Sequence, residues 1–118
     1  MFGFKIMITL TAALLFCGVS SGGPEAPRRI EITASKFSYS PNQITLKKGE
    51  PVVLVLHSTD TTHGMKIPDL NVNVTEIKKG KELEIPLDPT KIGQFKGKCA
   101  HFCGSGHGSM TIEIDVVE

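Results

Sequence analysis

The sequence predicts an all-β protein, folded as a β-sandwich of seven to eight short strands. Apolar and polar residues alternate along much of the chain, which is the pattern of strands that are buried on one face. Turn residues such as Pro-Asn, Lys-Gly and Asp-Pro interrupt this alternation roughly every ten residues. No stretch beyond the first 21 residues shows helical periodicity over two turns, so we expect no long helix in the folded part.

Seven segments carry the strand signal. One of them, Val52 to Leu56, is an unbroken apolar run that predicts a central strand buried on both faces. Another, Ile92 to Lys98, leads into the loop described below. The remaining five alternate in hydrophobicity and lie at 30–35, 44–46, 70–75, 83–87 and 110–116. We expect His57 to Asp69, which contains Gly64 and Pro68, to be a polar loop.

The first 21 residues predict an export signal. Lys5 precedes an apolar run from Ile6 to Phe16, and small residues follow at 18–21. This run is too short to span a bilayer, which needs about 20 apolar residues. We therefore expect a signal peptide over 1–21 and a location in the periplasm or on the extracytoplasmic face of the membrane.

Cys17 allows a second interpretation of the same segment. A cysteine at the end of a leader and before small residues is typical of a lipoprotein signal, which would end before Cys17 and attach the protein to a membrane through a lipidated cysteine. After the leader, residues 22–28 have the composition of a short tether. The folded domain is expected to span 29–118.

The charge balance excludes two classes of partner. The chain has 13 basic and 12 acidic side chains, and the leader holds one lysine and no acid, so residues 22–118 contain 12 of each. A net charge of zero argues against nucleic acid or a strongly charged membrane surface as the partner. The chain has no tryptophan and one tyrosine, so it also lacks a platform for base stacking.

The twelve residues from Cys99 to Met110 contain two thiols, two imidazoles and a thioether in a glycine-rich stretch. Thiolate and thioether ligands favour copper(I), zinc or iron–sulfur, and imidazole suits copper, zinc and iron. A thioether is a poor ligand for zinc, so Met110 favours copper. Met110 also shares the apolar phase of Ile112 and Ile114, so its sulfur should point inward.

The residues alone leave several interpretations of this loop open. Cys99 and Cys103 could form a disulfide, as two cysteines of an exported protein often do. A Cys2His2 zinc site is feasible but leaves Met110 without a role. A single blue copper would use Cys103, His107, Met110 and a distant histidine, and would leave Cys99 unused. Two metals bridged by both thiolates would use every soft donor.

The spacing Cys99-x-x-x-Cys103-x-x-x-His107-x-x-Met110 resembles the binuclear copper (CuA) motif of cytochrome c oxidase subunit II and nitrous oxide reductase. The stretch from His63 to Leu70 resembles the segment that carries the upstream histidine of that family. The similarity extends over about residues 42–117 and includes the strand before Cys99. It implies the cupredoxin fold, a Greek-key β-sandwich, with two copper ions at one end.

The resemblance implies one ligand set for the two copper ions. Both cysteines would bridge the metals, a histidine and the thioether would complete one of them, and a histidine and a backbone carbonyl would complete the other. In that order the ligands are Cys99, Cys103, His63, Met110, His107 and the carbonyl of His101. His101 stands where the oxidase family has a glutamate, but only its carbonyl is needed there. His57 has no counterpart in the motif, so we expect a structural or exposed role for it.

The function implied by this resemblance is electron transfer rather than catalysis. A fully coordinated site leaves no open position for a substrate, which catalytic metals require. The expected partner is a redox protein, such as a cytochrome or a terminal oxidase. An alternative with the same donors is a periplasmic copper-binding protein for delivery or storage. A third interpretation is a disulfide-closed β-sandwich that binds a partner without metal.

Overall fold

Nine β strands and two single-turn 3-10 helices form in the part of the chain that the computed structural model describes, residue 3 and residues 26–118. The strands are β1 (Arg28–Ser35), β2 (Ser38–Ser40), β3 (Gln43–Lys47), β4 (Val52–Ser58), β5 (His63–Ile67), β6 (Val72–Ile77), β7 (Glu82–Leu87), β8 (Gly93–Lys98) and β9 (Thr111–Val117). The 3-10 turns are η1 (Pro68–Leu70) and η2 (His107–Ser109). The predicted leader, Cys17 and most of the predicted tether lie outside the described residues.

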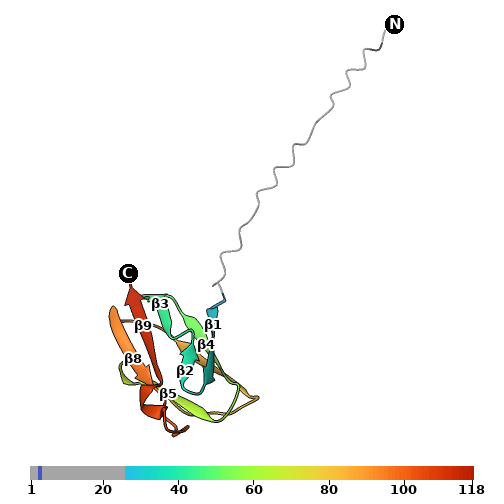
Figure 1. Ribbon diagram of the computed structural model, residues 1–118. Coiled ribbons are helices and arrows are strands. Elements are labelled where there is room, and N and C mark those ends of the chain that lie inside the picture. Colours follow the sequence, from blue (N-terminus) through green and yellow to red (C-terminus); the bar gives the residue numbers. More distant parts are fainter. Residues whose placement is uncertain (1–2, 4–25) are drawn as a thin grey trace.

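The strands form two sheets that pack face to face (Figure 1). One sheet has the strand order β2-β1-β4-β7, and the other has the order β3-β9-β8-β5-β6. Two neighbouring pairs, β1 with β4 and β3 with β9, run parallel, because the chain crosses from one sheet to the other between them. The remaining ladders are antiparallel. Pro86 lies in β7, an edge strand, where its missing N–H costs no ladder hydrogen bond.

The predicted central strand is confirmed. In β4, Val52, Leu54, Val55 and Leu56 are buried, and the strand lies between β1 and β7. The inward faces of both sheets supply one continuous apolar core, and alternate residues of β1, β3, β6 and β9 enter it. The all-β prediction is therefore correct, and its strand pattern describes most of the sandwich.

Two strands differ from the sequence prediction. The three-residue β2 is too short to show a period, and β5 lies inside the segment predicted to be a polar loop. In β5, His63, Gly64, Met65 and Ile67 are all buried, so a histidine and a glycine conceal the apolar character of the strand. The register of β5 against β6 also shifts between His63 and Met65, which interrupts the alternation.

The sheet with β8 and β9 brings the donor-rich loop beside β5. Lys98 at the end of β8 pairs with Thr111 at the start of β9, so the loop between them begins and ends at one point. Lys98 also pairs with Lys66 of the antiparallel β5, which places the start of β5 beside the residues that follow β8. The loop lies at one end of the sandwich (Figure 1). Among the described residues no helix is long and apolar enough to cross a membrane.

Candidate metal centre

Backbone hydrogen bonds close the loop from Cys99 to Met110. The N–H of Cys99 donates to the carbonyl of Met110 at 3.2 Å, and the N–H of His107 donates to the carbonyl of Gly104 at 3.1 Å. Gly104 has a φ of 137°, which a residue with a side chain rarely adopts. Gly106 lies against the ring of Phe37, where an added Cβ would be 2.4 Å from the ring. The glycines therefore let the loop fold tightly onto the sandwich.

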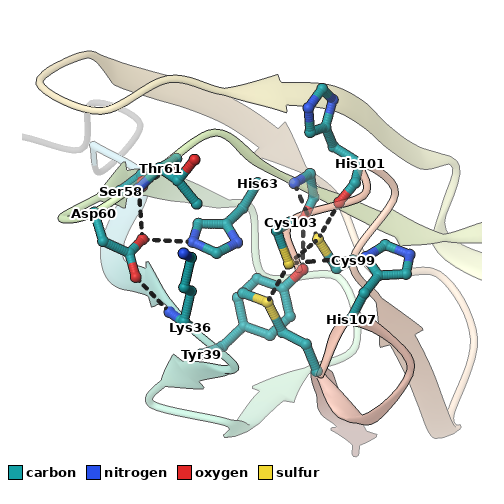
Figure 2. A network of polar contacts seen from close by, with 12 residues as sticks. Lys36, Tyr39, Ser58, Asp60, Thr61, His63, Cys99, His101, Cys103 and His107 are labelled. Carbon is teal, nitrogen blue, oxygen red and sulfur yellow. Dashed lines mark hydrogen bonds and ion pairs between the residues drawn. The ribbon is translucent and has the colours of Figure 1, made fainter. Parts of the chain in front are cut away.

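Thiols, a thioether and an imidazole converge inside this loop (Figure 2). The Sγ atoms of Cys99 and Cys103 are 3.7 Å apart, and Cys103 Sγ is 3.9 Å from Met110 Sδ. Cys103 Sγ is also 3.8 Å from His107 Nδ1. Ligand atoms of His63, Cys99 and Cys103 all lie within 4.8 Å of one another. The predicted donors from β5, the loop and the start of β9 thus meet in one place.

His63 enters the site with one ring nitrogen engaged and the other without a partner. Its Nε2 is 2.7 Å from Oδ1 of Asp60, and the imidazole is completely buried. Because the Asp60 carboxylate accepts the Nε2 proton, the neutral ring carries its lone pair on Nδ1. Nδ1 is buried and has no hydrogen-bond partner. A buried polar atom without a partner is costly, and a metal ion coordinated by that nitrogen would satisfy it.

The Asp60 carboxylate is held by three hydrogen bonds. Besides His63, the backbone N–H groups of Lys36 and Thr61 donate to it at 2.6 and 2.7 Å. Burial raises the pKa of Asp60, but these bonds outweigh that effect and hold the pKa at about 2. Asp60 is therefore ionised at any physiological pH and keeps the His63 ring in one orientation.

The two thiols are free and buried. Their Sγ separation of 3.7 Å is well beyond the roughly 2.05 Å of a disulfide bond, so the disulfide interpretation does not describe this structure. Burial, together with the neighbouring Cys99, raises the pKa of Cys103 to about 11. Without metal the Cys103 side chain is therefore a neutral thiol at physiological pH. Binding of a metal would release its proton, because the thiolate is the ligand.

The backbone of His101, rather than its ring, faces the site. The Cys99 thiol donates to the His101 carbonyl with a separation of 3.0 Å, and Figure 2 shows the imidazole directed away from both sulfurs. His107 is half-buried, and its ring lies 5.7 Å, centroid to centroid, from that of Phe102, which is 75% exposed. His107 therefore connects the buried donors with the surface of the loop.

The sequence prediction missed three residues that shape the site: Tyr39, Asp60 and Gly64. An acidic residue three positions before His63 was a usable signal for Asp60. The Tyr39 hydroxyl donates to the Gly64 carbonyl, and the Gly64 N–H donates to Cys99 Sγ at 3.4 Å. Burial, and the nearby Cys99 and Cys103, raise the pKa of Tyr39, so its hydroxyl stays a donor. Nothing local in the sequence connects Tyr39 with residues so distant along the chain.

His57 lies outside this site. It is half-buried in β4, and its ligand nitrogen lies within 4.8 Å of carboxylate oxygens of Glu31 and Glu82. Arg29 neutralises part of this exposed cluster, since it contacts Glu82 at 3.4 Å and Glu84 at 2.7 Å. The cluster is thus a network of solvated charges on the outer face of its sheet.

Fold and donor set together define a class of protein, the copper-binding β-sandwiches. Residues 6–112 match the family model of the cupredoxin-like domain, and the chain belongs to that family. The predicted cupredoxin fold is confirmed. Cytochrome c oxidase subunit 2 of Thermus thermophilus is 30% identical over 89 residues, which cover 75% of this chain and 65% of that protein. A second subunit 2, from another strain of the same species, matches with the same identity, and the alignment covers 52% of its length.

Solved structures of oxidase subunits share the fold. The periplasmic domain of subunit II of cytochrome oxidase from Bradyrhizobium japonicum superposes with a TM-score of 0.72 at 21% identity, covering 80% of this chain and 87% of that one. A chain of a heme-copper terminal oxidase dimer gives 0.69 at 27% identity, covering 76% and 65%. The folded domain is therefore homologous to the periplasmic domain of oxidase subunit II, and the chain spans about half to two thirds of its curated relatives.

Proposed function

We propose that the chain is an electron-transfer protein that holds a binuclear CuA-type copper centre. The observation that carries this proposal is the meeting of two free, buried thiols with the partnerless Nδ1 of His63. In the proposed centre Cys99 and Cys103 bridge the metals. The ligands that complete the two ions are His63 with Met110, and His107 with the carbonyl of His101. This set leaves no soft donor of the loop unused.

The donors come from a rigid framework, which suits electron transfer. Bound copper supplies one-electron redox chemistry, and sharing of that electron over two bridged ions halves the charge change at each. Cys99 and Met110 are joined by a backbone hydrogen bond, and Asp60 holds His63, so the ligands have little freedom to move when the charge changes. A full donor set also leaves no open position for a substrate, which argues against an enzyme.

His107 and Phe102 provide a route from the proposed centre to a partner. His107 is half-buried 3.8 Å from Cys103 Sγ, and the exposed Phe102 ring lies beside it. A redox protein such as a cytochrome or a terminal oxidase would dock here, in line with the oxidase subunits among the relatives. Because residues 22–118 have no net charge, apolar contact at Phe102 would contribute more to docking than charge.

We propose an exported location, in the periplasm or on the extracytoplasmic face of the membrane. The related domain from B. japonicum is periplasmic, and the leader at 1–21 has the composition of an export signal. Attachment through a lipidated Cys17 stays a prediction. Mass spectrometry of the mature protein, produced in a bacterium with both export routes, would distinguish a chain cut after Ser21 from one that begins at a modified Cys17.

The copper content and the absorption spectrum test the proposed function. Copper loading of the protein should give two ions per chain and, after oxidation, an intense purple colour. A delivery or storage protein would instead hold colourless copper(I), and a disulfide-closed protein would take up no metal. Either of these two results would contradict the proposal.

Replacement of the His101 imidazole should have little effect. In His101→Ala we expect unchanged copper content and nearly the same spectrum, because the carbonyl faces Cys99 and the ring points away. Metal analysis and absorption of the loaded variant provide the measurement, with His107→Ala as the matched variant that should lose copper. Loss of one copper from His101→Ala would show that the imidazole is a ligand.

Met110→Leu should change the reduction potential without loss of copper. Met110 is completely buried, and leucine preserves volume and apolarity, so the swap should cost less than about 1.5 kcal/mol. The thiolates and imidazoles supply most of the binding, whereas a weak axial thioether chiefly tunes the potential. Voltammetry of the loaded variant is the measurement. An unchanged potential with reduced thermal stability would make Met110 a packing residue only.

A further inference from the structure

The only tyrosine of the chain lies buried beside the proposed copper centre. Tyr39 is in β2 and is 2% exposed, and its hydroxyl donates a hydrogen bond to the carbonyl of Gly64 in the other sheet. This bond joins residues 25 positions apart, from the edge strand of one sheet to the strand that carries His63. Tyr39 contributes no atom to the donor set itself.

Gly64 connects that hydroxyl to a thiol. While its carbonyl accepts from Tyr39, its N–H donates to Cys99 Sγ at 3.4 Å (Figure 2). Gly64 is also tightly enclosed, because an added Cβ would lie 2.7 Å from the Val74 carbonyl oxygen and 2.9 Å from the His101 nitrogen. The orientation of the Gly64 N–H therefore depends on what holds this residue on each side, and the Tyr39 hydroxyl is the side-chain partner of its carbonyl.

Hydrogen bonds to a ligand sulfur alter the electronics of a copper–thiolate site. A donor to the sulfur withdraws electron density from the metal and favours the reduced state, so the potential depends on the geometry of that bond. The groups that orient such a donor affect the potential although they do not touch the metal.

We propose that Tyr39 is a positioning residue of the copper centre, which fixes the Gly64 N–H against Cys99 and thereby raises the reduction potential. The inference rests on the proposed function, since it assigns Cys99 as a copper ligand. It adds a residue from the opposite sheet to the set that determines the redox properties of the chain.

Tyr39→Phe removes the hydroxyl and keeps the ring, so it tests the proposal directly. We expect the loaded variant to retain its copper and to have a lower midpoint potential. In the metal-free variant, we expect faster hydrogen exchange at the Gly64 amide, measured by NMR. Val116→Ala is the control for stability alone, because Val116 is buried at the end of β9 far from the loop. It should lower the thermal stability and leave both the potential and the Gly64 amide unchanged.

An unchanged potential in copper-loaded Tyr39→Phe, or the same change in Val116→Ala, would overturn the proposal. Wild-type protein that takes up no copper would instead contradict the proposed function, so the two failures are distinguishable. If Tyr39→Phe does not fold, fluorotyrosine replaces it, because global incorporation alters position 39 alone. The fluorinated ring keeps its shape but makes the hydroxyl a stronger donor, so a shifted potential is expected and an unshifted one overturns the proposal.

Discussion

Serine in place of either cysteine of the loop is expected to abolish the binuclear copper centre. Cys99 and Cys103 lie 3.7 Å apart with both sulfurs buried among the other donors, where each could contact two metal ions. A serine hydroxyl is not ionised at neutral pH and is a hard donor, so it cannot replace a bridging thiolate. We expect Cys99→Ser and Cys103→Ser to bind at most one copper per chain and to lose the purple absorption.

The third cysteine offers a matched control for these variants. Cys17 lies outside the loop motif, so Cys17→Ser should keep the copper content and spectrum of the wild type. Circular dichroism of the metal-free serine variants would verify that each keeps its β structure. Two copper ions per chain and an unchanged spectrum in either loop variant would show that the sulfurs do not bridge.

A single methyl group at Gly64 is expected to disrupt the site from the β5 side. In Gly64→Ala the new Cβ would lie 2.7 Å from the Val74 carbonyl oxygen, 2.9 Å from the His101 nitrogen and 3.0 Å from the Ala100 Cβ. Two of these atoms belong to the backbone, so β5 and the loop must move apart. Overpacking of this kind costs about 1–3 kcal/mol, which thermal or denaturant unfolding of the metal-free variant would measure. The movement should also weaken copper retention against a chelator.

Gly108→Ala separates this steric effect from a general sensitivity of the loop. Gly108 lies within the same donor-rich segment, but an added Cβ there meets no atom within 4 Å. We expect Gly108→Ala to match the wild type in stability and copper retention. Equal behaviour of the two alanine variants would mean that the close approach of Gly64 to the loop has no influence on the centre.

Strand prediction succeeded where burial follows the backbone period. Segments such as Ile30 to Ala34 and Ile112 to Val116 alternate because one face of each strand enters the core. The same reasoning failed at β5, where the register shift near Gly64 and the buried His63 replace an apolar alternation. It also missed β2, whose three residues are held by pairing with β1 rather than by their own pattern.

For the candidate site, prediction depended on how local the information is. Cys99, Cys103, His107 and Met110 share one loop, so their spacing alone indicates a common ligand role. His63 required a resemblance to a known family, because no spacing rule connects it to the loop. Tyr39 acts through the Gly64 backbone, and only the folded arrangement of the two sheets brings it to Cys99. Residues that act through backbone atoms of other strands leave no pattern in a single sequence.

The central claim is that one electron is shared by two copper ions held between Cys99 and Cys103. Electron paramagnetic resonance of the oxidised, copper-loaded protein tests it most directly, because each copper nucleus splits the signal of an electron that resides on it. The proposed centre predicts hyperfine splitting from two equivalent copper nuclei, together with two copper ions per chain by metal analysis. Splitting from a single copper nucleus would contradict it.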